Sequence, residues 1–158
     1  MNANQIFSLE NKVALITGAS KGIGEAIARH FAACGAKVVI NSRKQEELDK
    51  VAESIRAEGG FCVGMAANAG DIPSCKALIQ KVVDELGGID ILVNNAATNP
   101  VYGPVLDCEE WAFDKIMNVN VKAAFELCRL CYPHLRKSSG ASVINISSIG
   151  GISPEHGL

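Results

Sequence analysis

The strongest constraint on the fold is a glycine-rich segment, residues 17–24, between an apolar run and a helical pattern. The run at 13–16 predicts a buried strand, and apolar residues at helical spacing predict a helix directly after the glycines. The first turn of a helix carries unpaired N–H groups and a partial positive charge, and glycines let an anion approach that backbone closely. The segment therefore predicts a diphosphate-binding turn of the dinucleotide-binding type.

The glycine spacing, G-x-x-x-G-x-G, leaves an alternative open. It differs from the G-x-G-x-x-G of the common dinucleotide fingerprint. It also differs from a P-loop, because no Lys-Ser or Lys-Thr pair comes after Gly24. A tight strand-to-helix turn that binds nothing would show the same segment, since fold does not imply function. The residues at the ends of the other strands distinguish a diphosphate-binding turn from a turn that binds nothing.

The rest of the chain alternates strand-like apolar runs with helical patterns. Strands are expected at 12–17, 37–41, 61–66, 89–93 and 142–147, all of them buried. Helices are expected at 22–34, 45–58, 72–86 and 109–136, the last kinked or broken near Pro133. This alternation predicts an α/β fold: a Rossmann-type, doubly wound parallel sheet in the order 3-2-1-4-5, within three α/β/α layers.

Ligands of such sheets bind beyond the carboxyl ends of the strands, where the strand order switches. Small or polar residues come after all five predicted strands: segment 18–24, the residues after Asn41, then Asn68, Asn94 and Ser147-Ser148. Because the carboxyl ends of parallel strands meet at one edge, these segments are expected to lie together. Because all five strands end in small or polar residues, the sequence favours a ligand site over a glycine turn that binds nothing.

Composition excludes several other classes of protein. The chain has 158 residues, is 48% hydrophobic and carries a net charge of -2. This suits one globular domain at 11–158 after an N-terminal arm at 1–10. No basic patch suggests nucleic acid, and no apolar run or signal suggests a membrane. The cysteines lack metal-site spacing, so we expect no metal and reduced thiols in a cytoplasmic protein.

Four motifs occur together in the order typical of one enzyme family: residues 17–24, Asn94-Asn95-Ala96, Asn120, and Ile146-Ser147-Ser148. From about Asn11 onward the chain resembles the short-chain dehydrogenase/reductase family. Segments 42–44 and 95–100 look more like its NADPH-dependent carbonyl and retinal reductase branch. The resemblance implies hydride transfer between nicotinamide and a small carbonyl or alcohol substrate, in a homo-oligomer (dimer or tetramer). The alternative is a non-catalytic nucleotide-binding or interaction module.

The residues around the second strand indicate NADP(H) as the cofactor. NAD enzymes usually place a carboxylate there to hold the ribose 2′-hydroxyl, but here the first acid is Glu46. Lys21 in the glycine turn and Arg43 could instead grip a 2′-phosphate through charge-assisted hydrogen bonds. The alternative is that Arg43 and Lys44 are only a solvated helix start.

The family resemblance implies a cofactor site built from the strand ends. By resemblance Asn68 bonds the adenine amino group, although a turn-forming role for it stays open. Ala97 replaces the usual glycine, and Asn94 is expected to tie neighbouring strands together. The predicted cofactor residues are Gly18, Ser20, Lys21, Gly22, Ile23, Gly24, Ser42, Arg43, Lys44, Asn68, Ala69, Asn95, Ala96 and Ala97.

By the same resemblance, Ser148 bonds the substrate oxygen and Asn120 orders a water in a proton relay, with Asn118 as the competing asparagine. The family moves its proton with Tyr-x-x-x-Lys, a motif that this chain does not contain. Relatives run to roughly 250 residues, with two more strands. The 158 residues are therefore expected to be the N-terminal part of a reductase, lacking the last strands and inactive alone.

Overall fold

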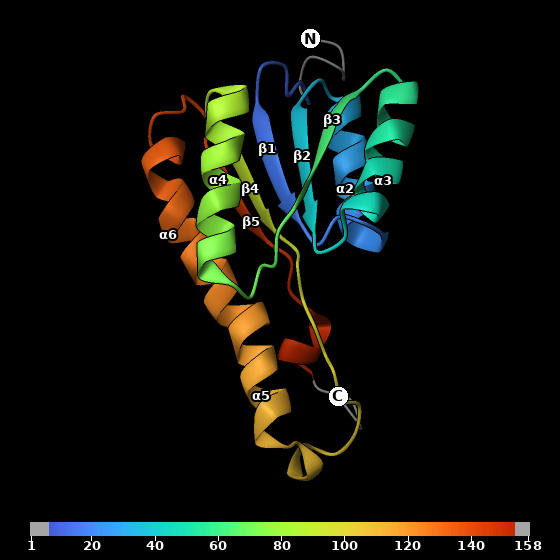
Figure 1. Ribbon diagram of the computed structural model, residues 1–158, viewed down its shortest axis with the longest axis vertical. Coiled ribbons are helices and arrows are strands. Elements are labelled where there is room, and N and C mark those ends of the chain that lie inside the picture. The colour runs from blue at the N-terminus through green and yellow to red at the C-terminus, as the bar shows by residue number, and fades with distance from the viewer. Residues whose placement is uncertain (1–6, 154–158) are drawn as a thin grey trace.

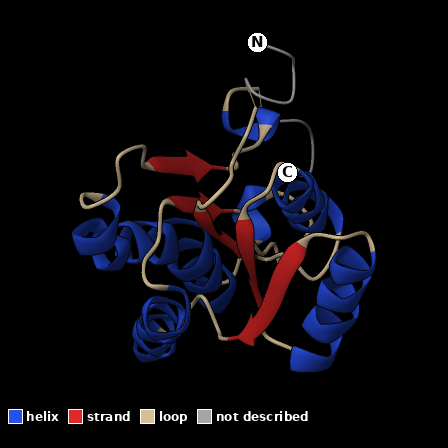
Figure 2. Cartoon of the chain, turned by 90° about the horizontal axis from the view of Figure 1, so that it is seen from above, coloured by secondary structure: helices blue, strands red, loops and turns tan. Residues whose placement is uncertain are grey.

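Five parallel strands form one sheet in the order β3-β2-β1-β4-β5 in the computed structural model, which describes residues 7–153. The strands are β1 (Val13–Thr17), β2 (Lys37–Ser42), β3 (Phe61–Ala66), β4 (Ile91–Asn94) and β5 (Ser142–Asn145). Helices cover both faces of the sheet (Figure 1 and Figure 2). The predicted doubly wound fold and strand order are confirmed.

The helices alternate with the strands along the chain. They are α2 (Gly22–Ala33), α3 (Gln45–Ala57), α4 (Ile72–Leu86), α5 (Glu110–Ile116), the π-helical η2 (Met117–Lys122) and α6 (Ala123–Leu135). Two short 3-10 turns complete the set, η1 (Val105–Asp107) and η3 (Ile149–Gly151). No helix within residues 7–153 has the length and apolar character needed to cross a membrane.

Two hydrophobic cores lie on opposite faces of the sheet because successive strand side chains point in opposite directions. On one face, Ile16 of β1 and Ile40 of β2 pack with α2 and α3. On the other, Leu15 of β1 and Leu92 of β4 pack with α4 and α6. Every residue of β1 is buried, which explains its continuous apolar sequence.

Helix α4 begins and ends where its sequence predicts. The Asp71 carboxylate accepts a hydrogen bond of 3.0 Å from the Ser74 N–H, and Pro73 occupies the first turn. The helix ends at Gly87, whose N–H donates to the Val83 carbonyl. The Asp71 cap thereby fixes the end of the loop between β3 and α4, at the carboxyl edge of the sheet.

The long helix predicted at 109–136 is wrong in one respect: its interruption lies at η2 and not near Pro133. α6 continues through Pro133 to Leu135, so this proline lies in the last turn of the helix. Within η2, the side chains of Asn118 and Asn120 bond to backbone groups of other loops. Such outside bonds stabilise the wider π turn, which is uncommon and often found at functional sites.

The prediction that all five strands are buried is wrong for β5, and in part for the other edge strand, β3, whose Phe61 and Ala66 are exposed. All four residues of β5 are exposed, including Val143 and Ile144. The sequence pattern alone suggests a buried strand because it is apolar, but burial depends on what covers the strand. Among residues 7–153, β5 pairs only with β4 and forms the edge of the sheet.

Candidate nucleotide-binding site

A cavity of about 520 Å³ opens at the carboxyl ends of β1 to β4, which are the lower ends of the strands in Figure 1. It lies at the switch in strand order, where ligands of doubly wound sheets bind. It is lined by Gly18, Ser20, Lys21, Gly22, Asn41, Ser42, Arg43, Lys44, Glu47, Ala67, Asn68, Ala69, Asn95, Ala96, Ala97, Thr98, Lys115 and Val119.

The glycine turn forms one wall, and its glycines differ in their surroundings. Gly18 has φ of +65°, and a Cβ atom there would lie 2.8 Å from the Ala96 Cα. At Gly24 an added Cβ would lie 2.5 Å from the Asn95 Nδ2. An added Cβ at Gly22, by contrast, would meet no atom within 4 Å. Gly18 and Gly24 therefore let the turn pack against the loop after β4, whereas Gly22 faces open space.

Thr17 joins the glycine turn to the loop after β4. Its hydroxyl donates to the Val93 carbonyl at 3.2 Å and accepts from the N–H groups of Asn95 and Ala96, both at 3.1 Å. The Asn95 amide donates in return to the Thr17 and Gly18 carbonyls, at 2.9 and 3.0 Å. This role of Thr17 was not predicted, although a polar residue at the end of an apolar strand was a usable signal.

Two further asparagines position the loops after β2 and β3. Asn41 is buried, and its amide donates to the Met65 and Ala67 carbonyls at 2.9 and 3.2 Å. Asn68 is exposed, lines the cavity and accepts from the Gly70 N–H at 3.1 Å. The turn-forming alternative for Asn68 is therefore present in the structure. Because a carbonyl oxygen has two lone pairs, this bond leaves capacity for a ligand.

Positive charge dominates the cavity. Lys21, Arg43, Lys44 and Lys115 line it, and Glu47 is the single carboxylate among its lining residues. The Lys44 Nζ lies 3.1 Å from the Glu47 Oε1. Within residues 7–153, no ion pair involves Lys21 or Arg43. An anionic ligand would therefore meet unpaired cations beside the glycine turn.

Glu47 interacts with several groups of the cavity at once. The hydrogen bond and the positive charge of Lys44 hold the pKa of the Glu47 carboxyl below its usual range, and the Ser20 hydroxyl and Lys21 lower it further. This carboxylate is therefore ionised at neutral pH. Glu47 was not among the predicted site residues, although its position in the first turn of α3, four residues after Arg43, was a usable signal.

The structure brings most of the predicted cofactor residues together. All of them line the cavity except Ile23, whose side chain is exposed, and Gly24, which is buried against Asn95. The lining residues that were not predicted are Asn41, Glu47, Ala67, Thr98, Lys115 and Val119. Lys115 belongs to α5 and Val119 to η2. No sequence motif predicts that these two helices lie over the carboxyl edge of the sheet.

The two predicted catalytic side chains do not line the cavity. Ser148 is exposed at the start of η3 and accepts from the Gly150 N–H at 3.2 Å. Asn120 accepts from the Thr98 N–H at 2.8 Å and donates to the Thr98 carbonyl at 2.9 Å. Asn118 donates instead to the Gly70 carbonyl at 2.8 Å. Both asparagines thus hold loops at the carboxyl edge of the sheet.

Asn94 ties neighbouring strands together, as predicted. Its amide donates to the Asn145 Oδ1 at 2.8 Å and lies 3.4 Å from the Cys128 sulfur. The first bond joins the carboxyl ends of β4 and β5. Because Asn94 is buried, its side chain bonds within the sheet and does not line the cavity.

The cysteines are free thiols buried to different degrees. Burial raises the pKa of Cys62 to about 11 and that of Cys131 to about 12, so both stay protonated at neutral pH. The thiolate is the nucleophile and the metal ligand, so these two side chains are unreactive in the folded state. In the part of the chain that the structure describes, no three His, Cys, Asp or Glu side chains are placed to hold a metal ion.

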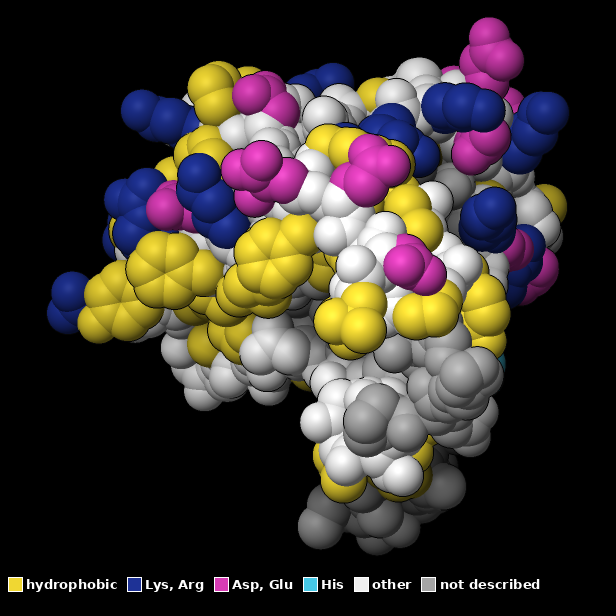
Figure 3. Space-filling model, turned by 90° about the horizontal axis from the view of Figure 1, so that it is seen from below, with side chains coloured by type: hydrophobic (Ala, Val, Ile, Leu, Met, Phe, Trp, Pro, Cys, Tyr) yellow, Lys and Arg dark blue, Asp and Glu magenta, His cyan; other side chains and the backbone are white. Residues whose placement is uncertain are grey.

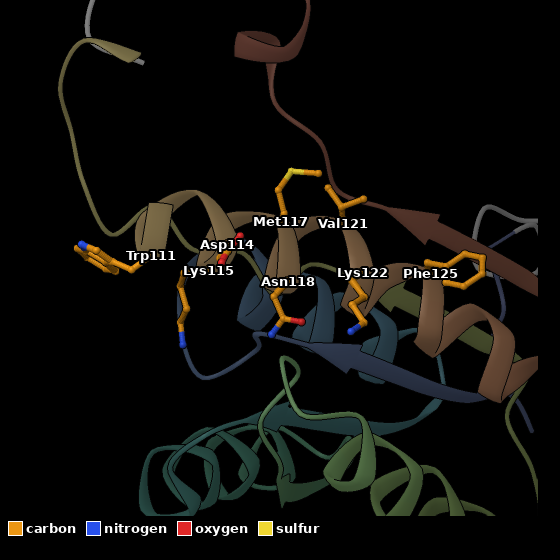
Figure 4. Close-up of a pocket in the computed structure, with 8 residues that line it drawn as sticks. All are labelled: Trp111, Asp114, Lys115, Met117, Asn118, Val121, Lys122 and Phe125. Carbon is orange, nitrogen blue, oxygen red and sulfur yellow. The ribbon is translucent and has the colours of Figure 1, made fainter. Parts of the chain in front are cut away.

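A second, larger groove of about 830 Å³ runs along α5, η2 and the start of α6. Its apolar lining residues are Trp111, Met117, Val121 and Phe125. Figure 4 shows Met117 and Val121 on one side of the helix, with Asn118 pointing to the other side. Seen from below, hydrophobic side chains gather on one side of the molecule (Figure 3). None of the predicted cofactor residues and neither predicted catalytic residue lines this groove.

Comparison with known proteins gives concordant results. The family model for short chain dehydrogenases matches residues 12–158. Dehydrogenase/reductase SDR family member 4 from Sus scrofa is 43% identical over 146 residues, covering 92% of this chain and 52% of the relative. The Homo sapiens protein of the same name is 42% identical over 150 residues, covering 95% of this chain and 54% of the relative. The chain thus spans about half the length of these curated relatives.

A solved structure gives the same picture. A metagenomic short-chain oxidoreductase, crystallised in complex with NADP, superposes with a TM-score of 0.88 at 36% sequence identity. The match covers 94% of this chain and 67% of that protein.

Proposed function

Because the chain belongs to the short-chain dehydrogenase family, we propose that it forms the NADP(H)-binding part of an oxidoreductase acting on a carbonyl or alcohol. The cavity at the switch in strand order, with the glycine turn on one side and two unpaired cations beside it, carries this proposal. The NADP bound to a similar short-chain oxidoreductase supports it.

The residues of the cavity fit a nicotinamide dinucleotide. The N-terminus of α2 offers unpaired N–H groups to a diphosphate, and the open space beside Gly22 leaves room for it. Asn68 would face the adenine, while the small residues Ala96 and Ala97 would pass close to the ribose of the nicotinamide half. The bound cofactor would supply or accept the hydride, and the protein would orient it.

We propose NADP(H) over NAD(H) because of the side chains after β2. NAD enzymes hold the 2′-hydroxyl with a carboxylate at this strand end. Here Asn41 is buried and used for loop contacts, and Arg43 lies two residues further on and lines the cavity. Arg43 and Lys21 would hold the 2′-phosphate through charge-assisted hydrogen bonds.

For the chemistry we propose that the Ser148 hydroxyl donates to the substrate oxygen and that Asn120 orders a water for proton transfer. Both asparagines lie in η2, but only the Asn120 side chain is held on the loop after β4, at Thr98, and this supports its choice over Asn118. We propose that a tyrosine and a lysine move the proton, as a Tyr-x-x-x-Lys motif that these 158 residues do not contain.

We also propose a domain at residues 11–158 after an arm at 1–10, a cytoplasmic location and a homo-oligomer, either a dimer or a tetramer. The family match from residue 12 onward supports the boundary. The free thiols support the location. The exposed apolar groove on α5, η2 and α6 supports the assembly, because large exposed apolar patches mark interaction sites.

Fluorescence titration with NADPH and NADH tests the cofactor assignment. Lys21→Ala and Arg43→Ala should each weaken NADPH binding about tenfold or more, since hydrogen bonds to charged groups contribute about 1.5–3 kcal/mol. NADH binding should stay within about a factor of two, because NADH lacks the 2′-phosphate. Lys50→Ala, an exposed lysine of α3 outside the cavity, is the control.

Equal wild-type affinity for NADPH and NADH would contradict the proposed 2′-phosphate site. Binding of neither nucleotide would contradict the proposed nucleotide-binding function as a whole. Tight NADPH binding by a longer protein that contains these residues but turns over no carbonyl substrate would instead support the non-catalytic module.

A further inference from the structure

The cavity contains one feature that a site built only to hold a phosphate would not need, the Glu47 carboxylate. It lies among the cations and is the only acidic side chain that lines the cavity within residues 7–153. Its oxygen is 3.1 Å from the Lys44 ammonium. Glu46 precedes it in the same first helical turn but does not line the cavity.

We propose that Glu47 competes with the cofactor's 2′-phosphate for Lys44, and so limits how strongly the protein prefers NADP(H) over NAD(H). This inference rests on the proposed function. Glu47 occupies the position of an internal anion in the 2′-phosphate subsite. A phosphate that binds there must separate the Lys44–Glu47 pair and approach a carboxylate of like charge.

The groups around Glu47 are the ones that a phosphate would use. Lys44, Ser20 and Lys21 line the same cavity as the carboxylate, and each of them can donate a hydrogen bond to a phosphate oxygen. Ser20 and Lys21 belong to the glycine turn, while Lys44 precedes α3. Glu47 therefore lines the cavity together with donors from both loops that would bind a 2′-phosphate.

The exposure of the pair makes the competition reversible. The Lys44 and Glu47 side chains are 74% and 44% exposed, and ion pairs of this kind contribute little to stability. A phosphate can therefore displace Glu47 without unfolding the turn. NAD(H) has no 2′-phosphate and leaves the pair intact, so the carboxylate weakens the binding of one cofactor only.

A different role for Glu47 would have the opposite effect. Its carboxylate could accept hydrogen bonds from the ribose hydroxyls of NAD(H), as the carboxylate after the second strand does in NAD enzymes. Removing its charge would then weaken NADH binding and leave NADPH binding unchanged. The ion pair with Lys44 favours competition, because it already engages one oxygen of the carboxylate.

Glu47→Gln tests the proposal, with Glu46→Gln as the matched control. The control removes the same charge from the adjacent, exposed position outside the cavity. Affinities for NADPH and NADH are measured by fluorescence titration, and those for adenosine 2′,5′-bisphosphate and 5′-AMP by calorimetry. Circular dichroism and urea unfolding establish that both variants fold.

We expect Glu47→Gln to bind NADPH and the bisphosphate about two- to fivefold more tightly, while NADH and 5′-AMP change less than about twofold. The gain should shrink at high salt, because exposed charges are screened. Glu46→Gln should leave all four affinities near the wild-type values.

Three results would overturn the inference while leaving the proposed function intact: no gain for NADPH in Glu47→Gln, the same gain in Glu46→Gln, or a loss specific to NADH. Wild-type protein that binds neither NADPH nor NADH would overturn the proposed function, and the inference with it.

Discussion

The absence of a Cβ atom at Gly18 allows the conformation of the glycine turn. Gly18 combines a positive φ with a close approach to the Ala96 backbone, so a methyl group there meets both backbone strain and a collision. Thr17 and Asn95 then fix the same turn through reciprocal hydrogen bonds. These bonds fix one wall of the cavity, and a fixed wall would lower the entropy lost when a ligand binds.

The first prediction concerns Gly18. Gly18→Ala should lower the free energy of unfolding by more than about 2 kcal/mol, since the left-handed conformation alone costs an ordinary residue about 1–2 kcal/mol. It should also weaken NADPH binding, because the turn can no longer pack on Ala96. Gly59→Ala is the control: φ there is +89°, but an added Cβ meets no atom within 4 Å.

Urea unfolding measures both variants. Gly59→Ala should show the strain alone, about 1 kcal/mol, and should bind NADPH normally. If Gly18→Ala were no less stable than Gly59→Ala, the close contact with Ala96 would not constrain the turn.

At the scale of elements, η2 connects the continuous helical segment α5–η2–α6, called the helical arm below, to the loops at the carboxyl edge of the sheet. α5 and the loop before it extend beyond the carboxyl edge of the sheet (Figure 1). The asparagines of η2 bind the two loops on either side: Asn118 holds the turn after β3, and Asn120 holds the loop after β4. A regular α-helix would turn these side chains by a different angle, so the π turn positions them.

The second prediction separates the two asparagines. Asn120→Ala should release Thr98, because both hydrogen bonds of its side chain go to that residue. Hydrogen exchange at the Thr98 amide should become at least about tenfold faster, while global stability falls by about 1 kcal/mol. Asn118→Ala, the matched control, should loosen the turn at Gly70 and leave Thr98 protected.

The opposite pattern, with Thr98 exchange unchanged in Asn120→Ala, would contradict the positioning role. In a longer, active protein, the two variants should also differ in turnover. A loss with Asn118→Ala alone would favour the competing asparagine.

At the scale of the whole molecule, one side of the structure carries apolar side chains that nothing within residues 7–153 covers. Trp111, Val121 and Phe125 on the helical arm are more than half exposed. Val143 and Ile144 of the edge strand β5 are exposed as well. An apolar groove beside an unpaired strand edge is unfavourable for an isolated chain, since both promote association.

The third prediction concerns this apolar surface. If the groove joins two copies, Phe125→Asp should convert the assembly to monomers, because a buried unpaired charge strongly opposes association. Sedimentation equilibrium measures the change. Phe113→Asp introduces the same charge at a similarly exposed phenylalanine of α5 that does not line the groove, and should leave the assembly intact. A shift in both variants, or in neither, would exclude the groove as the interface.

Much of this molecule could be predicted from local sequence patterns. The strand order, the helices, the N-cap of α4 and the role of Asn94 depend on hydrophobic periodicity, capping residues and the position of polar residues at strand ends. The glycine turn and most of its cavity partners could be predicted as well, because the carboxyl ends of parallel strands meet at one edge. Sequence by itself therefore determined the fold class and the place of the cavity.

Tertiary structure alone decided the features that depend on contacts across the chain. The interruption of the long helix lies at η2 because Asn118 and Asn120 find partners in loops that are distant in sequence. β5 is exposed because burial depends on neighbours and not on composition. Glu47 joins the cavity because α3 turns its first residues toward the glycine turn, which brings the carboxylate into the same cavity as Ser20 and Lys21. The local sequence pattern cannot specify these contacts, since each of them requires two segments that are distant in sequence to pack together.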